Sequence, residues 1–127
     1  MKKSAFVLSV FISASLFGCA SMAAGPAPAV ASNGVLTDAN GMTLYTFDRD
    51  TAASGTSACV DKCAANWPAL PAQATDQASG DFSIITRADG TRQWAFKGKP
   101  LYRWIKDQKA GDRTGDGVNQ VWHVARP

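Results

Sequence analysis

One ten-residue pattern occurs twice in this chain of 127 residues, at 41–50 and again at 98–107. Both copies have Gly, Leu, Tyr and Asp at the same offsets, and an aromatic residue follows each tyrosine by two positions. An internal repeat constrains the fold more than composition does, because it shows that the chain is built from two similar units. We therefore expect one domain at 34–127 made of two pseudo-repeats, 34–70 and 81–127.

The alternation of side chains along a strand gives the repeated pattern a physical meaning, because residues two apart point to the same face. Tyr45 and Phe47 share a face in the first copy, and Tyr102 and Trp104 share one in the second. Each repeat therefore presents an aromatic pair. Two such strands, related by a pseudo-twofold, would either stack these pairs in a common core or line a groove with them.

The aspartate that ends each copy lies beyond the expected strand, where a carboxylate can accept backbone N–H groups of a turn. A tyrosine–carboxylate site is the alternative interpretation. A catalytic site is normally used once, so the occurrence of the same residues at two equivalent places favours a structural role. We therefore predict a mainly structural role for the motif residues and the two loosely matching tryptophans: Tyr45, Phe47, Asp50, Trp67, Tyr102, Trp104, Asp107 and Trp122.

The composition is that of a turn-rich β protein, with eleven Gly, no Glu, and ten Asp as the only acids. The one helical candidate is 57–65, which Thr56 or Ser57 can cap and Pro68 ends. We expect a mainly β fold, a small antiparallel sandwich or partial barrel with one short helix near 57–65. The expected strands are 35–37, 42–48, 81–87, 91–96, 100–106 and 118–125.

Residues 1–18 are predicted to be an export signal, since two lysines precede an uncharged, mostly apolar run that is too short for a membrane span. The four residues that end at Cys19 resemble a lipobox, which would make Cys19 the lipidated first residue of the mature protein. The alternative is cleavage after Ala23, which would remove residues 1–23 and Cys19 with them. The Pro/Ala-rich segment 19–33 is predicted to be a tether.

Two locations follow from these alternatives. A lipidated chain would be anchored in a membrane, and Ala20 after the cysteine resembles an outer-membrane sorting signal, on either the periplasmic or the surface face. A chain cleaved after Ala23 would be a soluble periplasmic or secreted protein. Outside the leader the chain has eleven Lys and Arg residues and ten Asp residues, so the mature net charge is about +1. No basic stripe for nucleic acid remains, and export also argues against it.

Cys59 and Cys63 remain as a pair when Cys19 is lipidated or lost, and an oxidising compartment favours a disulfide between them. Residues four apart on a regular helix have Cβ atoms about 5–6 Å apart, whereas a disulfide needs roughly 3.5–4.5 Å. Either the turn between the cysteines is distorted or the thiols are free. A redox couple or a pair of metal ligands is the weaker interpretation, because His123 is the only histidine.

No other segment predicts catalysis, a metal site or a cofactor. His123 lies on the last expected strand between inward-facing neighbours, so we expect it to face solvent without a partner carboxylate. The segment 112–123 has oxygen-bearing residues at alternate positions, but its twelfth residue is His123 where a calcium loop needs Glu. A glycine-rich turn is the expectation there.

The motif resembles a family of bacterial secreted repeats, often predicted lipoproteins, that is named for Tyr-x-(Phe/Trp/Tyr)-x-x-Asp. The resemblance extends over roughly 34–127 and includes both copies of the motif, the cysteine pair and both matching tryptophans. It implies an exported β domain and no reaction. We therefore expect a non-enzymatic structural or binding domain of the cell envelope, anchored through lipid, with an envelope protein or small ligand as partner. The alternative is a periplasmic ligand- or redox-binding protein with an aromatic groove near the cysteine pair.

Overall fold

The computed structural model describes residues 27–127. The predicted signal, Cys19, the alternative cleavage site and most of the predicted tether lie outside this part. Within it, no helix is long and apolar enough to cross a membrane. The elements in chain order are β1 (Val30–Ser32), β2 (Val35–Thr37), β3 (Tyr45–Phe47), α1 (Lys62–Asn66), β4 (Phe82–Thr86), β5 (Arg92–Phe96), β6 (Lys99–Pro100), the 3₁₀ turn η1 (Val118–Gln120) and β7 (Trp122–Val124).

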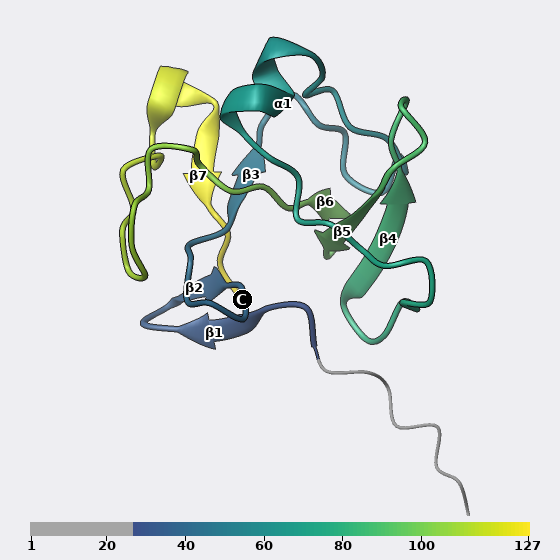
Figure 1. Cartoon of the computed structure of the whole chain (residues 1–127), viewed down its shortest axis with the longest axis horizontal. Coiled ribbons are helices and arrows are strands. Elements are labelled where there is room, and N and C mark those ends of the chain that lie inside the picture. The colour runs from purple at the N-terminus through teal and green to yellow at the C-terminus, as the bar shows by residue number, and fades with distance from the viewer. Residues whose placement is uncertain (1–26) are drawn as a thin grey trace, which may run out of the picture.

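The strands form three small antiparallel sheets, β1–β2, β3–β7 and β4–β5–β6 (Figure 1). Single bridges join them, and one of these pairs Tyr45 with Tyr102 through N–H···O bonds of 2.8 and 3.0 Å in both directions. The mainly β fold with one short helix and two repeats is confirmed, although the sheets do not close into a barrel. The reason is that the strands are short, two to five residues each, and turns interrupt every ladder.

The two repeats are interleaved, and neither forms a separate half. β3 of the first repeat pairs with β7 of the second, with Tyr45 opposite Val124. In the mirrored arrangement, Tyr102 of the second repeat forms a bridge with Ala69 of the first. Backbone hydrogen bonds also link the two repeats in both directions. The Leu70 amide donates to Leu101 O, and the Ala125 amide donates to Leu44 O. The pseudo-twofold is therefore present, and each side of it contains chain from both repeats.

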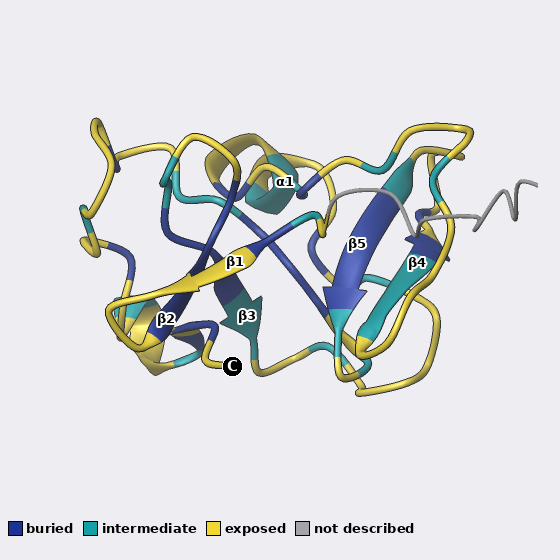
Figure 2. Cartoon of the chain, turned by 90° about the horizontal axis from the view of Figure 1, so that it is seen from below, coloured by how far each residue is buried: buried dark blue, intermediate teal, exposed yellow. Residues whose placement is uncertain are grey.

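The interior contains two clusters of apolar side chains. One is mostly aliphatic and joins Leu36, Leu44, Leu70 and Leu101 with Trp94. The other is aromatic and contains both motif tyrosines, Trp67, Trp122, Val35, Val124 and Cys59. Figure 2 shows β2 and β5 buried and β1 exposed along its length. Every Tyr and Trp of the described chain except the half-buried Trp104 is at least 94 % buried.

Three expectations about elements are wrong. β1 lies inside the segment 19–33 that was assigned to the tether, because the Asn33-Gly34 turn lets it pair with β2. The expected strand 100–106 is reduced to β6 and the single bridge at Tyr102. The expected strand 118–125 begins instead with η1, where Asn119 and Gln120 have positive φ and cannot extend a ladder.

Candidate functional site

The two motif tyrosines exchange partners across the pseudo-twofold. Tyr45 of the first repeat donates its phenol O–H to Asp107 Oδ2 of the second repeat at 2.5 Å. Tyr102 of the second repeat donates to Asp50 Oδ2 of the first at 2.6 Å. Both tyrosines have no exposed surface, Asp107 is buried, and Asp50 is half-buried. Each carboxylate therefore binds the phenol of the other repeat and not the tyrosine five residues before it in its own repeat.

The second oxygen of each carboxylate accepts hydrogen bonds from a short loop. Asp50 Oδ1 accepts the Ala58 amide at 2.6 Å. Asp107 Oδ1 accepts the Thr114 amide at 3.0 Å and the Thr114 hydroxyl at 2.6 Å. The expectation that the aspartates accept backbone N–H groups is thus met, and each carboxylate also has a phenol as a donor. Fully paired groups of this kind are what a buried charge needs in order to be stable.

The environment keeps both phenols protonated. Burial, followed by the hydrogen bond to Asp107, raises the pKa of Tyr45 far above its ordinary 10.0. Burial and the hydrogen bond to Asp50 do the same for the pKa of Tyr102. Burial also raises the pKa of Asp50, against the hydrogen bonds that it accepts from Tyr102 and Ala58. Each phenol therefore stays protonated near neutral pH and donates to the carboxyl group of its partner aspartate.

Four aromatic rings stack beside these pairs, in an order that alternates between the repeats. Trp67 and Trp122 form the centre, with centroids 3.7 Å apart and planes 5° apart. Trp104 stacks on the outer face of Trp67 at 4.0 Å, and Phe47 stacks on Trp122 at 4.2 Å. Tyr45 and Tyr102 approach the two central rings edge-on, at 5.4 and 5.1 Å. The expected stacking of the aromatic pairs in a common core is what the structure shows.

Gly115 is the residue that allows the phenols and rings to meet. Its amide donates to the Tyr45 phenol oxygen at 3.2 Å. A Cβ at this position would lie 2.8 Å from Trp67, 2.9 Å from Tyr45 and 3.0 Å from Trp104. A side chain fits there only if these rings shift, and a shift of Trp67 or Trp104 would open the stack. Sequence reasoning placed Gly115 in a glycine-rich turn and missed this role.

Cys59 and Cys63 form a disulfide, with Cα atoms 5.1 Å apart. The distortion that this bond needs is present between them, because Asp61 has φ 55° and α1 begins only after it. The helix expected at 57–65, with Thr56 or Ser57 as its cap, therefore begins later than expected, at Lys62. The Ser57 hydroxyl instead lies 2.6 Å from the Tyr102 phenol oxygen and accepts the Cys59 amide at 3.2 Å.

A buried arginine that sequence reasoning missed completes the second tyrosine's surroundings. Arg87 follows β4 and donates to Ser57 Oγ at 2.9 Å, to Gln93 Oε1 at 2.7 Å and to the Cys59 carbonyl. It thereby ties the disulfide loop to β5. The only sequence signal was its position after an alternating strand, which is shared by many exposed arginines.

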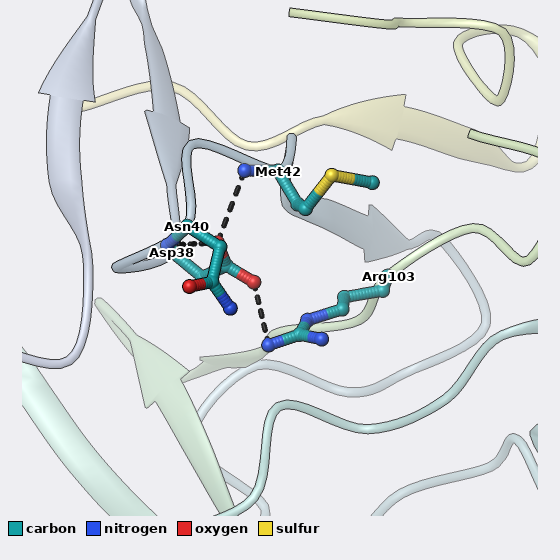
Figure 3. A network of polar contacts seen from close by, with 4 residues as sticks. All are labelled: Asp38, Asn40, Met42 and Arg103. Carbon is teal, nitrogen blue, oxygen red and sulfur yellow. Dashed lines mark hydrogen bonds and ion pairs between the residues drawn. The ribbon is translucent and has the colours of Figure 1, made fainter. Parts of the chain in front are cut away.

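A second charged residue that sequence reasoning missed, Asp38, joins the turn after β2 to the second repeat. Asp38 is buried, accepts the amides of Asn40 and Met42 at 2.8 and 3.0 Å, and pairs with Arg103 at 2.5 Å. Figure 3 shows the Arg103 side chain reaching toward Asp38 from the neighbouring segment. The hairpin cue at Asp38–Gly41 predicted the turn correctly but not the ion pair. Both residues stabilise the fold and lie apart from the tyrosine pairs.

The remaining candidates are His123 and the glycine-rich segment that contains Asp112. His123 is exposed as expected, but it has a carboxylate partner, with Nε2 2.7 Å from Asp48 Oδ2, which corrects the expectation that it has none. Asp112 caps a turn by accepting the Gln108 and Lys109 amides. Among residues 27–127, no three His, Cys, Asp or Glu side chains gather as a metal site.

An open groove of about 400 Å³ lies over the edges of the ring stack and beside the disulfide. Phe47, Trp67 and Trp122 contribute to its lining, although Trp67 is only 4 % and Trp122 only 2 % exposed. Cys63 contributes to its wall and is half-buried, whereas Cys59 has no exposed surface. The groove is lined by Phe47, Arg49, Ala58, Cys63, Asn66, Trp67, Asn119, Val121 and Trp122.

Comparison with known proteins identifies the repeat. Residues 29–70 and 83–126 each match a family described as a secreted repeat of unknown function. No curated protein and no solved structure matches the chain. The first match begins at residue 29, next to β1, and the second ends at residue 126, so together they include both tyrosine–aspartate pairs and the four stacked rings. The chain belongs to this family of secreted repeats, and its two copies fold together as one interleaved unit.

Proposed function

We propose that this protein is a non-enzymatic structural or binding module of the cell envelope, tethered by a lipid on Cys19. The observation that supports this most is the state of the motif residues: both tyrosines are buried, and every phenol and motif carboxylate has its partners. A catalytic group needs access to substrate, and none of the phenols has exposed surface. The residues that define the repeat therefore hold the fold together.

The groove beside the ring stack is the surface on which such a module would bind its partner. Small-molecule sites combine apolar walls with a few polar groups that set orientation. Here Arg49, Asn66 and Asn119 supply polar groups around the edges of Phe47 and Trp122. This observation also favours the second candidate function, a periplasmic protein that binds a small ligand.

Native mass spectrometry of the protein isolated from membranes tests binding in this groove. Ala58 is exposed and lines the groove, and only its backbone amide bonds Asp50, so Ala58→Trp fills the groove without breaking that bond. Ala74→Trp, in the exposed connector between the repeats, is the matched control. We expect a co-purifying mass that Ala58→Trp loses and the control keeps. A partner retained equally by both variants would place binding elsewhere and refute the groove.

The anchor is tested separately. Cys19→Ser removes the thiol that would be acylated, so the variant should leave the detergent phase for the aqueous phase in phase partition. The intact mass of the wild-type protein should exceed that of its polypeptide by the acyl groups. A mature protein that begins after Ala23 and lacks added mass would show that the chain is a soluble exported protein.

A further inference from the structure

The stack of rings and the two phenol–carboxylate pairs form one connected group with a gradient of charge. Tyr45 contacts the central ring of Trp67, and Tyr102 contacts that of Trp122. From Trp67 the stack continues to Trp104, which is half-buried and reaches the surface. The Lys106 ammonium lies 5.7 Å from the Trp104 ring centroid, at the outer end. The carboxylates of Asp50 and Asp107 lie at the inner ends.

We propose that this group is a one-electron relay, which carries an electron from the buried tyrosines through the tryptophan stack to a small diffusible one-electron oxidant at Trp104. The inference goes beyond the proposed envelope module and does not depend on it. The centroids of neighbouring tryptophan rings lie 3.7 and 4.0 Å apart, so the path of the electron through the three rings has no gap. Rings in van der Waals contact share π-electron overlap, which electron transfer between neighbouring rings requires.

The chemistry of the inner end is balanced by the motif carboxylate. When Tyr45 loses an electron, its O–H becomes strongly acidic, the O–H bond breaks, and the proton forms a new O–H bond on Asp107, 2.5 Å away. The products are a neutral tyrosyl radical and a neutral carboxylic acid, and the oxidant gains the electron. Tyr102 and Asp50 repeat this step at 2.6 Å. A positioned base is needed because both phenols are fully protonated before the step.

The direction of transfer follows from the same charges. A positive hole on Trp104 is disfavoured by the Lys106 ammonium over its ring, since like charges repel. A hole that moves inward to Trp67 and Tyr45 approaches the carboxylate of Asp107, which attracts it. Near Tyr102 the Arg87 guanidinium, which donates to Ser57, partly offsets the attraction by Asp50. At the phenols the hole is neutralised by loss of the proton. An oxidising equivalent that enters at the surface is therefore expected to settle on Tyr45 or Tyr102.

Pulse radiolysis with the azidyl radical, a neutral one-electron oxidant that becomes azide, tests the relay in the folded protein. The chain has only two tyrosines and four tryptophans, so transient absorption reports these residues directly. We expect a tryptophanyl signal that decays while a tyrosyl signal grows at the same rate, independent of protein concentration. The growth should slow in D₂O, because the phenolic proton moves in that step. A tyrosyl signal that grows at the same rate in H₂O and in D₂O would overturn the proposal.

Two sets of variants identify the residues. Asp50→Asn with Asp107→Asn keeps the side-chain shape but removes both bases, and we expect tyrosyl growth to slow about 100-fold, the effect of a lost general base. Trp104→Phe should lower the tyrosyl yield, whereas Trp94→Phe, in the other apolar cluster, should leave it unchanged. Far-UV circular dichroism checks that each variant is folded. Unchanged growth in a folded double Asn variant, or equal losses from Trp104→Phe and Trp94→Phe, would refute the relay.

Discussion

Alkaline pH should unfold this domain through its two tyrosines. Tyr45 and Tyr102 are the only tyrosines of the chain, and neither has exposed surface. Burial and the paired aspartates raise both phenol pKa values above the 10.0 of an ordinary tyrosine. Because the folded values lie above the unfolded ones, the stability that the tyrosines contribute is complete below about pH 10 and is lost as the pH rises further.

The size of the effect follows from proton linkage. A group that is ionised only in the unfolded chain lowers the free energy of unfolding by about 1.36 kcal/mol per pH unit. Two tyrosines therefore remove roughly 2.7 kcal/mol per unit above the unfolded pKa. A domain of this size with a stability of about 5 kcal/mol loses it over roughly two pH units. We expect the unfolding midpoint near pH ~12.

A single pH titration measures both events. Tyrosinate absorbance follows ionisation of Tyr45 and Tyr102, and far-UV circular dichroism follows the fold. We expect the two signals to change together in one narrow range of pH. The Tyr45→Phe/Tyr102→Phe double variant is the control, and the dependence of its urea midpoint on pH should be much flatter. Tyrosinate that appears gradually near pH 10, while the circular dichroism stays native, would refute the reasoning.

Three substitutions test the other contacts by urea unfolding. Gly115→Ala should cost about 1–3 kcal/mol by overpacking and change the near-UV spectrum of the stack. Gly111→Ala meets open space but has φ +89°, so it should lower stability through backbone strain alone and leave that spectrum unchanged. Tyr45→Phe should lower the free energy of unfolding by about 1.5–3 kcal/mol. Tyr102→Phe should lower it less, because Asp50 is only half-buried and water can replace the phenol. A larger loss from Tyr102→Phe than from Tyr45→Phe would contradict this. Replacing both Cys59 and Cys63 with alanine should cost about 2 kcal/mol for so short a loop, and a reducing agent should then lower the stability of the wild-type protein only.

Local patterns predicted the parts of this fold that depend on neighbouring residues. The expectation that Tyr45 and Tyr102 have a structural role agrees with their burial, although Leu44 and Leu101 beside them are buried as well. The cysteine spacing left either a distorted turn or free thiols, and the structure has the distorted turn, with Asp61 at positive φ. The strands β2, β4 and β5 lie within the expected ranges, since strong turn signals flank each of them.

The pairing between the repeats could not be predicted from these patterns. Each aspartate lies five residues from its own tyrosine, and nothing in that spacing shows that Asp107 binds Tyr45 and not Tyr102. The partner depends on how the repeats pack, which is a tertiary effect. Arg87 and Arg103 were missed for a related reason, because a buried arginine is recognised by its partners and not by its neighbours in sequence. β1 was hidden by an Ala- and Pro-rich composition that usually marks a linker.

The interleaving has a consequence for the origin of the domain. Gly41 of the first repeat faces Ala110 of the second, and Gly98 of the second faces Ala53 of the first. Reciprocal contacts of this kind are the signature of an isologous dimer, in which the same surface of two identical chains meets itself. A single ancestral repeat would have reached this arrangement only as a pair of chains. The connector holds the second repeat at an effective concentration of about millimolar, so the pairing of the two repeats does not depend on the concentration of the protein.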